Sequence, residues 1–140
     1  MSKSPQPLRV LPQRVPGSIK KRQLLNDQEL KAETCREYGE KFLALGWWED
    51  ALEFFQKGHD PQGLEKIKNH CLETGDAYLL ARLGAPQDPH TWQRLATRAL
   101  DLGKFHFARR AYKLSGDPDK AAMVEALISG TETEKTQDQD

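Results

Sequence analysis

Cysteine is scarce in this sequence, which contains only Cys35 and Cys71 and no CxxC spacing. Two cysteines placed this way cannot form the disulfide framework of a small secreted domain. Long hydrophobic runs are missing too. No stretch approaches the roughly 18 apolar residues of a membrane-spanning helix, and the N-terminus has no apolar signal-peptide core. We therefore expect a soluble protein of a reducing compartment, most simply the cytoplasm.

Net charge is also missing, because 21 basic residues balance 21 acidic ones among the 140. A neutral chain has no overall field that would attract nucleic acid. The charges are unevenly distributed, however. Residues 1–26 hold six basic side chains, four prolines and no acid, whereas residues 129–140 hold four acids and one lysine. We expect a flexible, proline-rich basic arm over 1–26, one helical domain over 27–128 and a disordered acidic tail over 129–140.

Residue patterns for catalysis, metal binding or phosphate binding are not found. The four histidines have no HxxxH or HExxH spacing. His70 and Cys71 are adjacent, so on a helix they point about 100° apart and cannot form a local Cys–His pair. Cys71 fits a small core residue better than a nucleophile, and the glycines are expected to mark helix ends. We expect no catalytic residue, no metal site and no cofactor, and interpret the protein as non-enzymatic.

What the sequence does contain is a repeat. Residues 46–64 realign on residues 103–121, which matches Gly46 with Gly103 and Phe55 with Tyr112. Asp-Pro pairs begin at positions 60, 88 and 117, so they are 28 and 29 residues apart. Self-similarity at a fixed period of this size is typical of solenoids.

Each repeat carries the start and stop signals of short helices. Asp followed by Pro favours a helix start, because Asp accepts hydrogen bonds from unpaired N–H groups and Pro fits the first turn. Apolar residues then recur at helical spacing, and a glycine ends the helix. These signals predict about seven helices, near residues 27–45, 47–57, 61–74, 76–83, 89–102, 105–112 and 118–128.

Aromatic residues at equivalent positions of the repeats are the predicted core contacts. They are the pairs Trp48/Phe105 and Phe55/Tyr112. A large aromatic side chain stabilises a stack of helices by about 1.5–3 kcal/mol when it is buried. Ala51 and Ala108 are expected where two helices cross closely.

These residues resemble the tetratricopeptide repeat (TPR) and its superfamily of helical-hairpin solenoids. If Gly46 is the inter-helix glycine, Gly39 takes the small position of the first helix, and Trp48, Ala51 and Phe55 take the aromatic, small and aromatic positions of the second. The repeats are shorter than the family's roughly 34 residues, which indicates a divergent branch. The resemblance implies an all-α fold, a right-handed α–α superhelix of about three helical hairpins plus a C-terminal capping helix.

The resemblance also implies a function, that of an adaptor or scaffold. Such a protein binds a peptide or helix of another protein in a concave groove formed by the first helix of each hairpin. Carried over by position, the groove residues are Arg36, Glu40, Leu43, Lys66, Asn69, Gln93, Arg94 and Thr97. We expect the chain to be a monomer or a weak homo-oligomer, and the partner's identity does not follow from the sequence.

Two further surfaces are candidates. Trp47 is the best single hot-spot residue, since tryptophan concentrates binding energy, although it would equally serve to cover a neighbouring helix. The basic run Lys104, Arg109, Arg110 and Lys113, together with the basic arm, would suit an acidic partner or nucleic acid. The plainer interpretation of this run is a solvated helix face. A nucleic-acid-associated module is therefore the alternative function, and the net-acidic middle of the chain argues against it.

Overall fold

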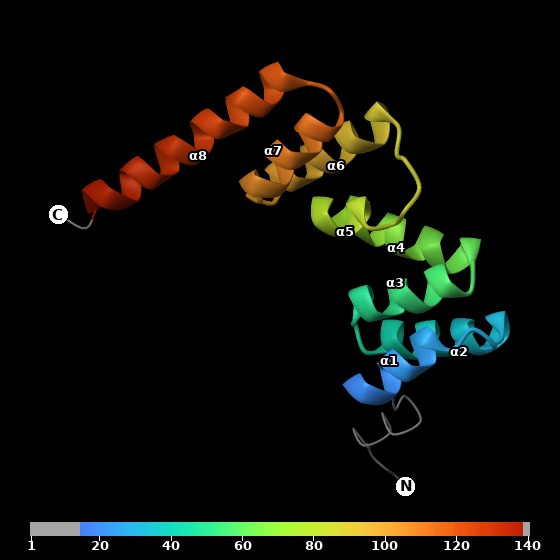
Figure 1. The fold of residues 1–140 in the computed structure, drawn as a ribbon. Coiled ribbons are helices and arrows are strands. Elements are labelled where there is room, and N and C mark those ends of the chain that lie inside the picture. The colour runs from blue at the N-terminus through green and yellow to red at the C-terminus, as the bar shows by residue number, and fades with distance from the viewer. Residues whose placement is uncertain (1–14, 139–140) are drawn as a thin grey trace, which may run out of the picture. The chain divides into compact units, whose positions relative to one another are not determined.

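The computed structural model describes the backbone of residues 15–138 and the side chains of residues 15–131. Helices are the only regular secondary structure in this range (Figure 1). They are α1 (Ser18–Asn26), α2 (Ala32–Ala44), α3 (Trp48–Lys57), α4 (Pro61–Thr74), α5 (Ala77–Ala81), α6 (Pro89–Asp101), α7 (Phe105–Leu114) and α8 (Pro118–Asp138). The all-α prediction is confirmed, and helices α2 to α8 correspond to the seven predicted ones.

The N-terminal end differs from the prediction in two places. Helix α1 lies inside the segment predicted to be a flexible arm, because the prolines end at Pro16 and the following SIKKRQLLN consists mostly of good helix formers. The next helix begins at Ala32 and not near Asp27. The Asp27 carboxylate accepts a hydrogen bond from the Glu29 N–H, and its carbonyl accepts one from the Leu30 N–H, so this stretch forms a turn. Residues 1–14 of the predicted arm lie outside the described residues.

The C-terminal prediction is also wrong for most of its length. The composition predicts a disordered tail from residue 129, but α8 continues to Asp138. Residues 131–138 contain no proline, and Gly130 alone costs a helix only about 1 kcal/mol. The helix already begun at Pro118 therefore continues through polar residues. Residues 139 and 140 are outside the described range.

The chain divides into two compact units, residues 1–67 and residues 68–140. In the first unit α2 packs against α3, and α1 contacts α3. In the second unit α6 packs against α7 and α7 against α8, while α5 contacts both α6 and α7. Each unit buries its own set of apolar side chains. The first buries Cys35, Phe42, Ala51, Leu52, Phe54, Phe55 and Ile67, and the second is centred on Ala77, Leu80, Trp92, Leu95, Ala99, Ala108 and Tyr112.

Phe55 is the centre of the first unit, held between two helical glycines. A Cβ atom at Gly39 of α2 would lie 2.4 Å from Cε1 of the Phe55 ring, and one at Gly63 of α4 would lie 2.4 Å from its Cδ1. No real side chain tolerates contacts that short, so both positions require glycine as packed. Both glycines lie inside helices, which corrects the expectation that glycines here mark only helix ends.

The predicted aromatic core contacts agree with the structure only in part. Phe55 and Tyr112 are buried, whereas Trp48 and Phe105 are half-buried. The sequence pattern missed Phe54, which is fully buried and stacks on Phe42 with ring centroids 5.6 Å apart. At about 100° per residue, the buried side chains of α3 form one face that is broader than the predicted stripe.

The predicted start and stop signals work as expected. Asp88 Oδ1 accepts a hydrogen bond of 2.7 Å from the Thr91 N–H, which caps α6, and Asp60 Oδ1 accepts one of 3.2 Å from the Gly63 N–H. Gly46, which follows α2, has a φ of +76°, in the left-handed region where glycine is favoured. After α3 the same backbone region is occupied by His59, whose φ is 50°.

Candidate binding surfaces

In the first unit, residues of α2 line a hollow on the surface. Its volume is about 510 Å³ and its lining residues are Glu33, Arg36, Glu37, Glu40 and Lys41. Lys66, from α4, reaches Glu40 with a distance of 2.8 Å between Nζ and Oε2. Three of the predicted groove residues, Arg36, Glu40 and Lys66, thus lie around one hollow of mixed charge. Leu43 is half-buried on the same helix.

In the second unit, residues of α4 and α6 line a smaller hollow. Its volume is about 370 Å³, and its lining residues are Leu72, Arg94, Thr97, Arg98 and Asp101. The guanidinium of Arg98 is fixed to the neighbouring helix, because its Nε donates to the Glu73 carbonyl at 2.7 Å. This hollow offers an apolar patch at Leu72, an exposed guanidinium at Arg94 and one carboxylate at Asp101.

The other predicted groove residues are less central. Asn69 is exposed on α4. Gln93 is half-buried on α6, and its backbone carbonyl accepts a hydrogen bond of 3.0 Å from the Thr97 hydroxyl. Neither residue lines the hollow beside Leu72.

Trp47 lies in the turn between α2 and α3, immediately before the first residue of α3. Half of its surface is exposed, and its ring lies 5.9 Å from the buried ring of Phe42. Both residues line a pocket of about 680 Å³ whose other wall is α1, including Lys21 and Leu25. The sequence pointed to Trp47, but it did not reveal α1 beside it. The signal that could have revealed α1 is the change from a proline-rich segment to helix formers after Pro16.

The predicted basic run does not form one surface. Arg109 Nη1 lies 2.6 Å from Glu125 Oε2 of α8, whereas Arg110 lies over the Tyr78 ring of α5, with Cζ 5.3 Å from its centroid. Lys104 Nζ donates to the Thr74 carbonyl at 2.6 Å. Consecutive residues of a helix point about 100° apart, so Arg109 contacts α8 whereas Arg110 contacts α5. This basic run is largely used in contacts within the second unit.

The two cysteine thiols are buried and reduced. Burial, helped by the negative charge of Asp76, raises the pKa of Cys71 to about 12, so the group is a neutral thiol at physiological pH. Burial also raises the pKa of Cys35 and lowers that of His70. Over the part of the chain that the structure describes, no three His, Cys, Asp or Glu side chains gather as a metal site would require.

Among the described residues, none of the helices combines the length and the apolar character needed to cross a membrane.

No protein-family model matches the chain, and comparison with curated proteins and with solved structures gives no match. The surfaces described above are therefore the basis for a functional proposal.

Proposed function

We propose that this protein is a cytoplasmic interaction module, an adaptor or scaffold that binds a peptide or helix of another protein along the first helices of TPR-like repeats. The observation that carries this proposal is the hollow between α4 and α6. These helices begin consecutive repeats, and the hollow that they line combines the apolar Leu72 with the exposed Arg94 and with Thr97. A few polar groups around an apolar patch are what peptide recognition requires.

The finer architecture is part of the same proposal. We infer that the helical pairs are divergent TPR-like hairpins of a right-handed superhelix. The close approach of α2 to α3 at Gly39 and Phe55 supports this inference, because the resemblance puts a small residue and an aromatic at these positions. The fully buried Ala51 and Ala108 support it in the same way.

The two hollows differ in charge, which defines the partner's chemistry. Three glutamates and two cations line the hollow on α2, whereas two arginines and one aspartate line the hollow between α4 and α6. The second hollow therefore suits a segment with an acidic residue beside an apolar one. In the first hollow Lys66 pairs with one of the glutamates, so its charges are balanced and it suits a segment that carries both signs. Such charges contribute mainly to specificity and association rate.

The test is a pair of charge reversals on different faces. Arg94→Glu changes the hollow between α4 and α6, and Lys113→Glu makes the same change on α7, outside both hollows. We expect a partner captured from the source cells by the wild-type chain to be lost with Arg94→Glu and retained with Lys113→Glu. Circular dichroism must give the same melting temperature for all three chains. A partner that survives both Arg94→Glu and Arg36→Glu would refute the groove proposal.

The alternative, a nucleic-acid-associated module, has less support. Of its proposed face, Arg109 pairs with Glu125, Lys104 donates to a backbone carbonyl and Arg110 covers Tyr78. Phosphate contacts need cations that point to solvent. Lys113 is the exposed cation that fits this description best.

A further inference from the structure

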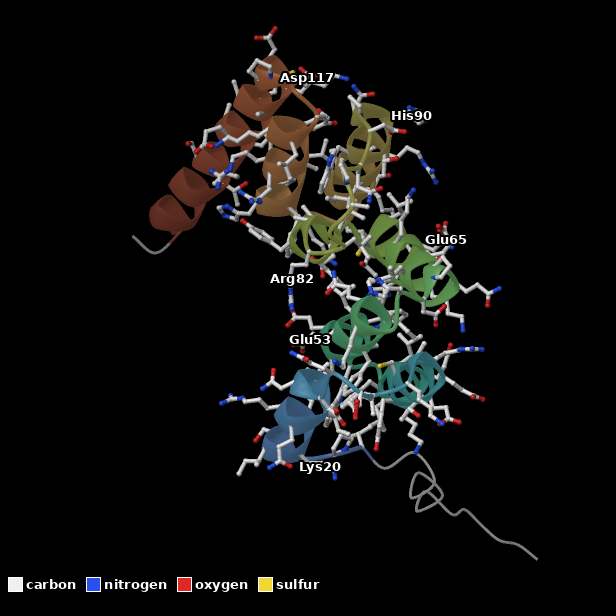
Figure 2. All side chains as sticks on the ribbon, turned by 45° about the vertical axis from the view of Figure 1, so that its right-hand side comes forward. Lys20, Glu53, Glu65, Arg82, His90 and Asp117 are labelled. Carbon is white, nitrogen blue, oxygen red and sulfur yellow. The ribbon has the colours of Figure 1, made fainter. Side chains whose placement is uncertain are left out.

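Helix α1 is held on the first unit by an ion pair and by little apolar packing, since Leu24 and Leu25 are only half-buried. None of its residues is buried, and Ile19 is 76% exposed. Its contact partner is α3. There the ammonium of Lys21 lies between two carboxylates, in hydrogen-bond contact with Asp50 and 2.5 Å from Glu53 Oε1. Figure 2 labels Glu53 on α3 and Lys20, the neighbour of Lys21, on α1.

The surface beneath α1 has two chemical parts. Phe42 and Trp47 form an apolar floor, and Asp50 and Glu53 form an acidic rim. We call these four residues the α3 socket. Helix α1 does not fill it, since a pocket of about 680 Å³ remains between α1 and the floor. Helix α1 also leaves Trp47 half exposed.

The acidic rim is matched to a cation. Burial pulls the pKa of Lys21 down, but the hydrogen bonds to Asp50 and Glu53 and the charges of both carboxylates outweigh it, and the pKa lies above its ordinary value. Lys21 is therefore charged throughout the physiological range. The pairing is partly exposed, with about a fifth of the Lys21 side chain and a third of each carboxylate accessible. Such a pair contributes modestly to stability and weakens with salt.

We propose that the α3 socket is a second binding site, which takes a basic amphipathic helix from another protein, and that α1 occupies it within the chain as a weak competitor. The charge complementarity of Lys21 with Asp50 and Glu53 defines the ligand. The partner helix carries a lysine or arginine for the rim and, three or four residues later, larger apolar side chains for the floor, in the spacing that Lys21, Leu24 and Leu25 show in α1. This site is separate from the first-helix hollows and does not depend on them.

The proposal is tested with the full chain and a labelled synthetic peptide of residues 15–30. Lys21→Glu places a third negative charge beside Asp50 and Glu53, so α1 should leave the socket. In fluorescence anisotropy, the peptide should bind the Lys21→Glu chain at least roughly tenfold more tightly than the wild type, because the internal competitor no longer reduces the fraction of open sockets. Raising the salt should weaken this binding.

Lys20→Glu is the matched control, because it makes the same charge change at the exposed neighbouring position. The Lys20→Glu chain should bind the peptide as weakly as the wild type does. A peptide that itself carries Lys21→Glu should not bind. Equal affinity for all three chains, or for both peptides, would overturn the proposal.

Two further measurements cover the remaining outcomes. If the Lys21→Glu chain does not fold, hydrogen exchange of the wild-type chain tests instead whether α1 is held in the α3 socket by charge. The α1 amides must exchange faster at high salt than at low salt while those of α3 do not change, and equal exchange of α1 at both salts refutes the proposal. Light scattering tests whether the occupant of the α3 socket is a second copy of this chain. A wild-type dimer that Lys21→Glu abolishes would make the occupant the α1 of a second copy and overturn its assignment to another protein.

Discussion

At the scale of single residues, Gly39 shows how tightly the first unit is packed. A methyl group there would lie within 2.4–2.8 Å of three atoms of the Phe55 ring. Overpacking of this kind costs roughly 1–3 kcal/mol. We expect Gly39→Ala to lower the free energy of unfolding by that amount in urea titrations.

Gly130→Ala is the control for this substitution. Gly130 also lies in a helix, but a methyl group added there would have no atom within 4 Å beyond its own stretch of helix. Alanine is favoured over glycine inside helices by up to about 1 kcal/mol. The control should therefore be neutral or stabilising, and a Gly39→Ala chain as stable as the control would contradict the packing at Phe55.

The two predicted aromatic contacts of α3 differ in burial, which gives a second residue-scale prediction. Phe55 is fully buried, whereas Trp48 is half-buried. Removing a fully buried aromatic costs roughly 3–5 kcal/mol. We expect Phe55→Ala to reach that range in urea unfolding and Trp48→Ala to fall clearly below it. An equal loss from the two substitutions would show that Trp48 is a core residue after all.

At the scale of helices, the Asp88 carboxylate that caps α6 makes the stability of the fold depend on pH. The hydrogen bond from the Thr91 N–H, joined by the Thr91 hydroxyl, holds the pKa of Asp88 below its ordinary value. A depressed folded-state pKa stabilises the fold above the unfolded-state pKa, and this contribution is lost as the pH falls through the folded-state pKa. The loss should therefore occur below about pH 4.

Asp88→Asn isolates that contribution. Asparagine still accepts a hydrogen bond from the Thr91 N–H but does not titrate. We expect a melting temperature near that of the wild type at neutral pH and a smaller drop between about pH 4 and pH 2.5. Asp119→Asn, which removes an exposed carboxylate in the first turn of α8, should follow the wild-type drop. Identical acid profiles for Asp88→Asn and the wild type would exclude the cap as the source.

Helices α2 to α8 were predictable because most of them are bounded by local signals, an Asp-Pro or Asp start and a glycine stop. Helix α1 and the last part of α8 have no such signal. They are formed from residues whose helix propensity is good but whose apolar pattern is weak, so the composition of their segments suggested disorder. The start of α2 was misplaced because Asp27 suits a turn as well as a cap.

At the scale of the whole molecule, the balance of 21 basic and 21 acidic residues bears on the alternative function. Non-specific nucleic-acid binding depends on unpaired cations and counterion release. Because Arg109 and Lys104 already have partners, we expect no retardation of single- or double-stranded nucleic acid in a low-salt gel-shift assay. Retardation that Arg109→Glu/Arg110→Glu abolishes would instead favour the nucleic-acid module.

The candidate surfaces were predictable where they depend on one helix and not where they depend on two. Arg36 and Glu40 on α2, and Arg94 and Thr97 on α6, are positions that the TPR resemblance implies along a single helix, and each pair lines one hollow. The contact of Lys66 with Glu40 joins different helices, as do the pairing of Arg109 with Glu125 and the position of α1 beside Trp47. Such contacts depend on how helices pack, which a pattern within one helix does not encode.

The Asp-Pro pairs described as helix starts have one more consequence, which is chemical. The peptide bond between aspartate and proline is the one most readily hydrolysed by warm dilute acid, because the carboxyl group attacks its own carbonyl and the proline nitrogen is a good leaving group. Residues 60, 88 and 117 each precede such a bond. Mild acid would therefore cut the unfolded chain into four fragments, 1–60, 61–88, 89–117 and 118–140, and mass spectrometry would read the repeat boundaries directly.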